Sequence, residues 1–175
     1  MLRTNPNAIN ELSKRRGLVW HHILMVILVV LSGFNFFYGS RVIGGAHYGS
    51  SAEAEAVYFY FPGLQTVDSV YGWFCVALAT LGFVLVYFLY RKKKQGPFFL
   101  PFFFALNAAG QIVYLVADLA VMSNAGGNTA DIIKDSLRQM VFSGAMLTVI
   151  LTLVFSAGMI VLNKIYYDKR KDMFS

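Results

Sequence analysis

Charged residues are scarce in this chain of 175 residues, at 14% of the sequence, whereas a soluble domain carries about 25%. Hydrophobic residues make up 57%. This composition disfavours a soluble enzyme and favours an integral membrane protein.

Cysteine and histidine are equally few. Cys75 is the only cysteine, which excludes an internal disulfide or a dithiol redox pair. Of the three histidines, His21 and His22 are adjacent on one apolar segment, where we expect them to stay hydrated at the membrane interface, and His47 lies in a loop. Two haem ligands would have to come from facing helices, whereas these histidines occupy only one apolar segment. We therefore expect no metal site and no cofactor.

Catalytic motifs are missing as well. The sequence contains no phosphate-binding loop, no Gly-x-Ser-x-Gly turn and no His-Glu-x-x-His pattern. No residue is therefore assigned a catalytic role, although a lipid-acting enzyme that uses Asp68 and Asp118 as paired acids stays open.

Long apolar segments dominate what is present. Four of them are long enough to cross a hydrocarbon core of about 30 Å as helices. They are continuously apolar, whereas barrel strands alternate. We therefore predict an all-α fold, an integral membrane four-helix bundle that forms a single domain over 1–175, with spans at 17–38, 66–90, 98–122 and 139–162.

The basic residues predict the orientation. All of the 15 lysines and arginines lie on one side of these spans except Arg41, Lys134 and Arg138. By the positive-inside rule, both termini are cytoplasmic. The net charge of +6 comes from short clusters beside the spans, which indicates contact with the lipid bilayer and no nucleic-acid partner.

The loop between the first two spans carries an aromatic run. Ser50 and Glu53 form a capping-box pattern that predicts a short helix, and Pro62 and Gly63 should end it. Two interpretations of the aromatic run stay open: an interfacial belt, or a lid and partner surface over a site in the bundle. The residues in question are Tyr58, Phe59, Tyr60 and Phe61.

Polar residues recur inside the spans. Asn107, Gln111, Tyr114 and Asp118 are spaced four, three and four apart, which places them within a sector of about 60° on one helix. Asn35, Asp68 and Arg138 fall near the same outer level as Asp118. These seven residues are the candidates for ligand or ion binding, and the alternative is that they only fix helix register through mutual hydrogen bonds. We expect Arg138 to pair with Asp118 or Asp68.

The C-terminal stretch NKIYYDKRKDMF at 163–174 follows the fourth span, and a basic cluster at 91–94 is followed by Pro97. With these features the chain resembles uncharacterised small four-helix integral membrane proteins of bacteria. The resemblance implies a location in the bacterial inner membrane, and it implies no activity.

The leading functional hypothesis is an accessory or interaction subunit of the cytoplasmic membrane with a membrane protein partner. The first alternative is a homo-oligomeric small transporter or channel, lined by the polar stripe of the third span. The second is a receptor or immunity protein that binds a peptide or lipid at the outer aromatic loop. No repeat relates the two halves of the chain, so an inverted-repeat transporter gains no support.

Overall fold

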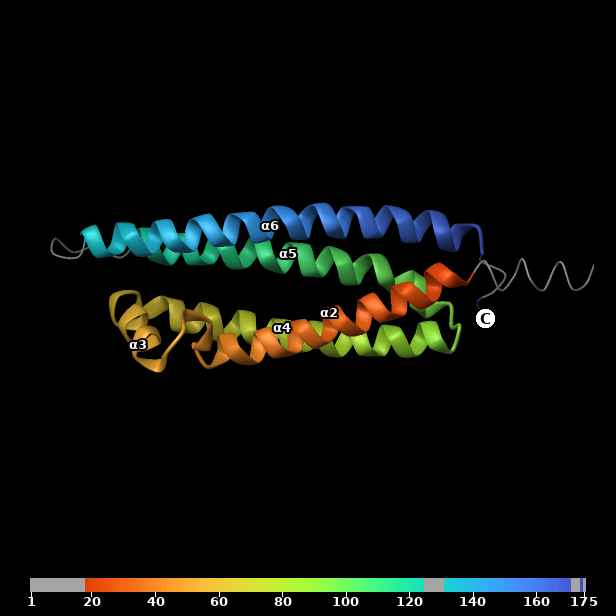
Figure 1. Ribbon diagram of the computed structural model, residues 1–175, viewed down its shortest axis with the longest axis horizontal. Coiled ribbons are helices and arrows are strands. Elements are labelled where there is room, and N and C mark those ends of the chain that lie inside the picture. The colour runs from red at the N-terminus through yellow and green to blue at the C-terminus, as the bar shows by residue number, and fades with distance from the viewer. Residues whose placement is uncertain (1–17, 125–130, 171–173, 175) are drawn as a thin grey trace, which may run out of the picture.

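The computed structural model describes residues 18–124, 131–170 and 174, without the side chains at 124, 131–134, 136–138 and 140–145. This part of the chain is all-helical, as predicted. The helices are α2 (Val19–Ile43), the short 3-10 helix η1 (Ala46–Tyr48), α3 (Ser51–Tyr60), α4 (Pro62–Tyr90), α5 (Gln95–Asn124) and α6 (Asp131–Asp168). Figure 1 shows their arrangement.

Four helices are long and apolar enough to cross a membrane, which confirms the prediction of a multi-pass chain. The segments that could cross a membrane are Val19–Ile43, Pro62–Tyr90, Gln95–Ser123 and Met146–Asp168. The helices extend beyond the apolar runs, because backbone hydrogen bonding continues past the residues that hydrocarbon requires. Pro62, for example, opens α4 at its first turn, where a missing N–H is no loss.

The long helices pack in chain order. α2 lies against α4, α4 against α5, and α5 against α6, so that α2 and α4 form one layer and α5 and α6 the other (Figure 1). The start of α2, the turn at 91–94 and the end of α6 lie together at one end, which we call the basic end. The opposite end, which carries η1 and α3, is the loop end.

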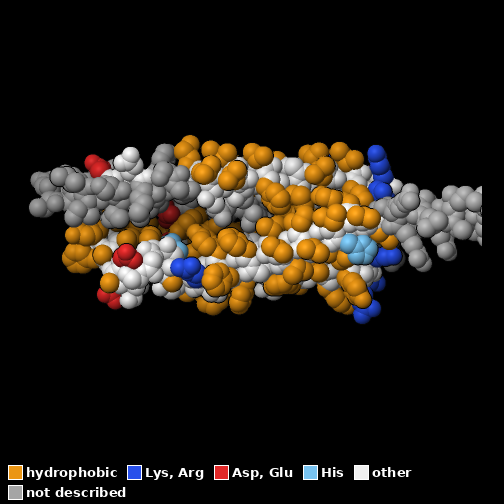
Figure 2. Space-filling view, in the orientation of Figure 1, with side chains coloured by type: hydrophobic (Ala, Val, Ile, Leu, Met, Phe, Trp, Pro, Cys, Tyr) orange, Lys and Arg blue, Asp and Glu red, His pale blue; other side chains and the backbone are white. Residues whose placement is uncertain are grey.

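The surface agrees with this division. In Figure 2 apolar side chains cover the middle of the visible face, most lysine and arginine side chains gather at the basic end, and acidic side chains lie toward the loop end. The exposed apolar side chains include Val30, Phe34 and Val113. In water such a surface would be costly, so it suits a lipid environment.

Glycines allow α2 and α4 to approach closely. A Cβ atom added to Gly39 would lie 2.6 Å from the carbonyl oxygen of Gly72, and one added to Gly72 would lie 2.5 Å from Cγ1 of Ile43. Small residues at a helix contact are a common way to bring backbones together in membranes.

The basic-end half of the molecule has an apolar core. Leu28, Leu85, Phe103 and Phe104, from α2, α4 and α5, are each at most 1% exposed and belong to one contiguous cluster. The polar residues of the loop-end half lie outside this cluster.

The loop between α2 and α4 forms the predicted short helix. The Ser50 hydroxyl accepts a hydrogen bond from the Glu53 backbone, and the Glu53 side chain accepts one from the Ser50 backbone. This capping box starts α3 at the expected position. The chain then turns at Phe61 directly into α4.

The expectation for His21 is wrong. His21 is only 2% exposed, and its Nδ1 atom lies 2.9 Å from the hydroxyl of Tyr167, with which it shares a hydrogen bond. Phe174 packs against both rings. The hydrogen bond to α6 allows the imidazole to be buried, which sequence spacing alone could not reveal, whereas His22 is exposed as expected.

Candidate functional site

The loop-end half contains a buried carboxyl group, Asp68, in the second turn of α4. Its residue is 0% exposed. Tyr58 of α3 donates a hydrogen bond to Oδ2 at 2.9 Å, and Tyr114 of α5 donates one to Oδ1 at 2.7 Å. Asp68 therefore joins three helices through one side chain.

His47 approaches the same carboxyl group from η1. Its Nε2 atom lies 3.5 Å from Asp68 Oδ2, and neither ring nitrogen has a hydrogen-bond partner among the described residues. Burial lowers the pKa of His47, and the attraction of Asp68 offsets only part of this effect. The imidazole is therefore neutral at pH 7.

Tyr48 completes the ring of aromatic residues around Asp68. Its ring lies 3.9 Å from that of His47 and packs edge-on against Tyr58. Burial raises the pKa of Tyr48, and the carboxyl groups of Asp68 and Asp118 raise it further. Asp68 and Asp118 therefore both lie close enough to Tyr48 to influence its hydroxyl group.

Asp118 is the second buried acid of this region. It lies on α5 one turn beyond Tyr114 and is 3% exposed. Its Oδ1 atom has no hydrogen-bond partner among the described residues. A buried carboxyl oxygen without a donor is costly, so this atom marks a position where a donor or cation belongs.

The rest of the predicted α5 stripe continues toward the middle of the membrane span. Tyr114, Gln111 and Asn107 are half-buried, and Asn35 of α2 is buried. Beyond Asn107 the next turn of α5 carries the buried Phe103 and Phe104, so the polar stripe on α5 ends at Asn107. Buried polar residues of the other helices continue past this level, at Ser32, Ser156 and Asn163.

The predicted aromatic run divides in the structure. Tyr58 reaches Asp68, and Phe61 is 1% exposed and packs with Val57, Leu64 and Met122. Phe59, in contrast, is 79% exposed, and Tyr60 is half-buried. One side of α3 thus covers the region around Asp68 and Asp118, which we call the acidic region. The other side of α3 faces outward.

Arg138 belongs to α6, but its side chain lies outside the described residues. Its expected pairing with Asp118 or Asp68 stays a prediction. Arg41 is the other arginine that the sequence predicts on this side. Its guanidinium donates to the backbone oxygen of Ala46 and lies 6.0 Å from the Phe37 ring.

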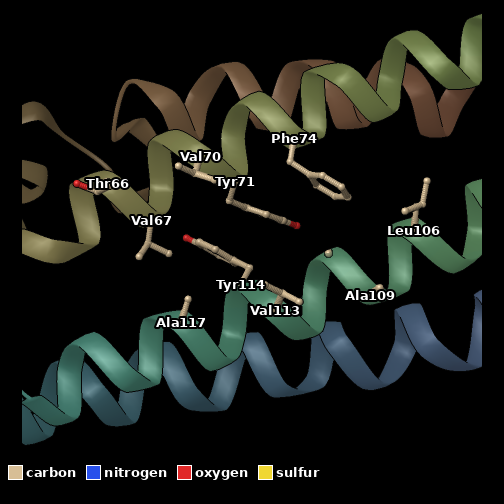
Figure 3. Close-up of a pocket in the computed structure, with 11 residues that line it drawn as sticks. Thr66, Val67, Val70, Tyr71, Phe74, Leu106, Ala109, Val113, Tyr114 and Ala117 are labelled. Atoms are coloured by element: carbon tan, nitrogen blue, oxygen red, sulfur yellow. The ribbon is translucent and has the colours of Figure 1, made fainter.

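A groove of about 420 Å³ lies between α4 and α5, and Tyr71 and Tyr114 form part of its wall. In Figure 3 Tyr71 and Tyr114 stack between the two helices, with Phe74 and Leu106 further along. The two tyrosine ring centroids are 3.9 Å apart. Tyr114 thus lines this apolar groove and also reaches Asp68 through its hydroxyl group.

Sequence reasoning missed His47, Tyr48 and Tyr71. The available signal is the pair of glycines around η1: Gly45 and Gly49 both have positive φ angles, of 69° and 111°, and such positions let the chain turn sharply. That turn brings His47 back over α4.

Among the described residues, no group of three or more His, Cys, Asp or Glu side chains comes together that could hold a metal ion.

In comparisons with known proteins, no family model matches this sequence, and no curated protein or solved structure matches it.

Proposed function

We propose that this protein is an accessory subunit of a cytoplasmic membrane complex, folded as a four-helix bundle with both termini in the cytoplasm. Its acidic region at the loop end receives a cationic group from a partner membrane protein. The single observation that carries this proposal is Asp118, a buried acid with an unpartnered Oδ1 atom beside a second buried acid.

The charges around the two acids support a cationic partner. The described partners of Asp68 are uncharged, namely the tyrosines Tyr48, Tyr58 and Tyr114 and the neutral imidazole of His47. Arg41 turns away to the backbone of Ala46. Since a buried acid in a membrane span is stabilised by an opposite charge, an arginine or lysine from a partner helix suits the position of Asp118.

The end of the α5 stripe at Asn107 favours binding over transport. A pathway would need polar groups that line one continuous route through the span, whereas Leu28, Leu85 and Phe103 pack together in the basic-end half. The transporter alternative therefore requires a route between copies of the chain, which a homo-oligomer would reveal.

The experiment is native mass spectrometry of the protein extracted in mild detergent from its own membranes, for the wild type, Asp118→Asn and Glu55→Gln. Glu55 is an exposed acid on α3 and serves as the matched control. We expect a stoichiometric second protein with the wild type and with Glu55→Gln, and its loss with Asp118→Asn while the helical circular dichroism is kept.

Two results would contradict the proposal. A homo-oligomer without any other protein would contradict the accessory role and favour the transporter. A partner retained by Asp118→Asn would show that this acid is not the contact.

The orientation is tested separately by thiol labelling of intact cells in a Cys75→Ala background. Glu55→Cys should react with a membrane-impermeant maleimide, whereas Lys93→Cys should react only after permeabilisation. The reverse pattern would place the termini outside.

A further inference from the structure

The basic end carries a second cavity that the acidic region does not use. It has a volume of about 380 Å³ and lies between the first turns of α5 and the last turns of α6. Its apolar wall includes Pro97, Phe98, Pro101 and Phe174. Phe98 is 62% exposed, so this wall continues onto the outer surface of α5.

The rim of the cavity is charged. Lys94 and Lys164 line it from the two helices, and Asp168 lines it as well. Both lysines are exposed, and neither has an ion-pair partner among the described residues. Two ammonium groups therefore border an apolar cavity, with one carboxylate that opposes an anion.

The position of the cavity indicates which anion it would meet. It lies at the end where the lysines and arginines gather (Figure 2), and the apolar helices begin or end at this level. In a bilayer this level is occupied by lipid phosphates, with acyl chains directly below them. A soluble anion would gain nothing from the phenylalanine and proline wall.

We propose that this cavity is a binding site for an anionic glycerophospholipid. The phosphodiester lies between the ammonium groups of Lys94 and Lys164, and an acyl chain lies against Phe98 and Pro101. Basic cavities between membrane helices on the cytoplasmic side are known to hold acidic lipid headgroups. This site does not depend on the proposed partner at the loop end.

The test is a lipid titration followed by native mass spectrometry of the full-length protein in detergent, with phosphatidylglycerol as the probe. The variant Lys94→Gln/Lys164→Gln removes both rim charges. The matched control Lys92→Gln/Lys93→Gln removes the same charge from the neighbouring turn, outside the cavity. At about 1 kcal/mol per lysine near a lipid surface, the first variant should bind on the order of 30-fold more weakly, and the control should bind nearly as well as the wild type.

A third variant, Asp168→Asn, should bind phosphatidylglycerol more tightly, because it removes the opposing charge from the rim. Phosphatidylcholine should show no saturable binding, and millimolar inorganic phosphate should not displace the lipid. Equal losses in the two double variants, or equal binding of the two lipids, would overturn the proposal. Displacement by phosphate would assign the site to a free anion instead.

Discussion

Tyr114 donates a hydrogen bond of 2.7 Å to Asp68, and this contact joins α5 to α4 across 46 positions of the sequence. The same tyrosine stacks on Tyr71 of α4. The carboxyl group that is most deeply buried in the loop-end half thus also connects the two layers of helices.

Removal of this hydroxyl should destabilise the protein. In Tyr114→Phe, Oδ1 of Asp68 loses its donor while the ring and its stacking remain, and we expect a loss of about 1–2 kcal/mol in the free energy of unfolding. Thermal unfolding in detergent, followed by circular dichroism, measures it. Tyr90→Phe is the control, since Tyr90 is 71% exposed, and equal midpoints for the two variants would contradict the role of the hydrogen bond.

His47 should make the stability fall in acid. Burial holds its pKa in the folded protein below the ordinary value of 6.5, so the unfolded chain takes up a proton first as the pH decreases. Protonation then favours unfolding, and stability that is present above about pH 6.5 is lost below it.

The measurement is the unfolding midpoint between pH 7.5 and pH 5 for the wild type and His47→Asn. The wild type should lose more stability than the variant over this range, since all other titrating groups are shared. A variant with the same pH dependence, or a wild type that gains stability in acid, would show that His47 is not the group responsible.

The contact between α2 and α4 predicts opposite effects for two pairs of glycines. Gly39→Ala or Gly72→Ala places a Cβ within 2.6 Å of backbone or side-chain atoms of the neighbouring helix, and we expect a loss of about 1–3 kcal/mol. Gly33→Ala and Gly158→Ala meet nothing within 4 Å and should stabilise their helices by about 0.5–1 kcal/mol. Unfolding of the four variants in detergent compares them directly, and similar values for both pairs would argue against close packing at Gly39.

Arg138 provides a test of the acidic region from within the chain. If its guanidinium pairs with Asp118 or Asp68, Arg138→Leu leaves a buried acid without its cation, and the protein should unfold at lower temperature or titrate differently in acid. Arg41→Leu, which removes an exposed arginine at the same end, is the control. An Arg138→Leu variant that matches the wild type in both measurements would exclude the pair and leave Asp118 to the proposed partner's cation, whereas a destabilised variant would favour a cation from within the chain over one from a partner.

Apolar length and local capping explain why much of the fold could be predicted. The four long helices follow from their hydrophobic runs, and α3 follows from Ser50 and Glu53. Helix periodicity also puts Asp68 and Cys75 on one face of α4, and both are buried. These features depend on residues within a few turns of each other.

The partners of Asp68 could not be predicted in the same way. Tyr58 reaches it because α3 folds back over α4, and His47 reaches it because Gly45 and Gly49 reverse the chain. Periodicity gives the face of each helix but not the rotation of a loop above it. For the same reason, the aromatic run could not be divided in advance into the inward Phe61 and the outward Phe59.

The two hydrogen bonds to Asp68 differ in when they can form during synthesis. Tyr58 precedes Asp68 by only ten positions, so the nascent chain can supply this donor as soon as α3 and α4 have left the ribosome. The donor from Tyr114 must wait for α5. An acid that would oppose membrane insertion on its own can therefore enter the bilayer with the Tyr58 hydroxyl already beside it, and the later hydrogen bond from Tyr114 then joins α5 to α4.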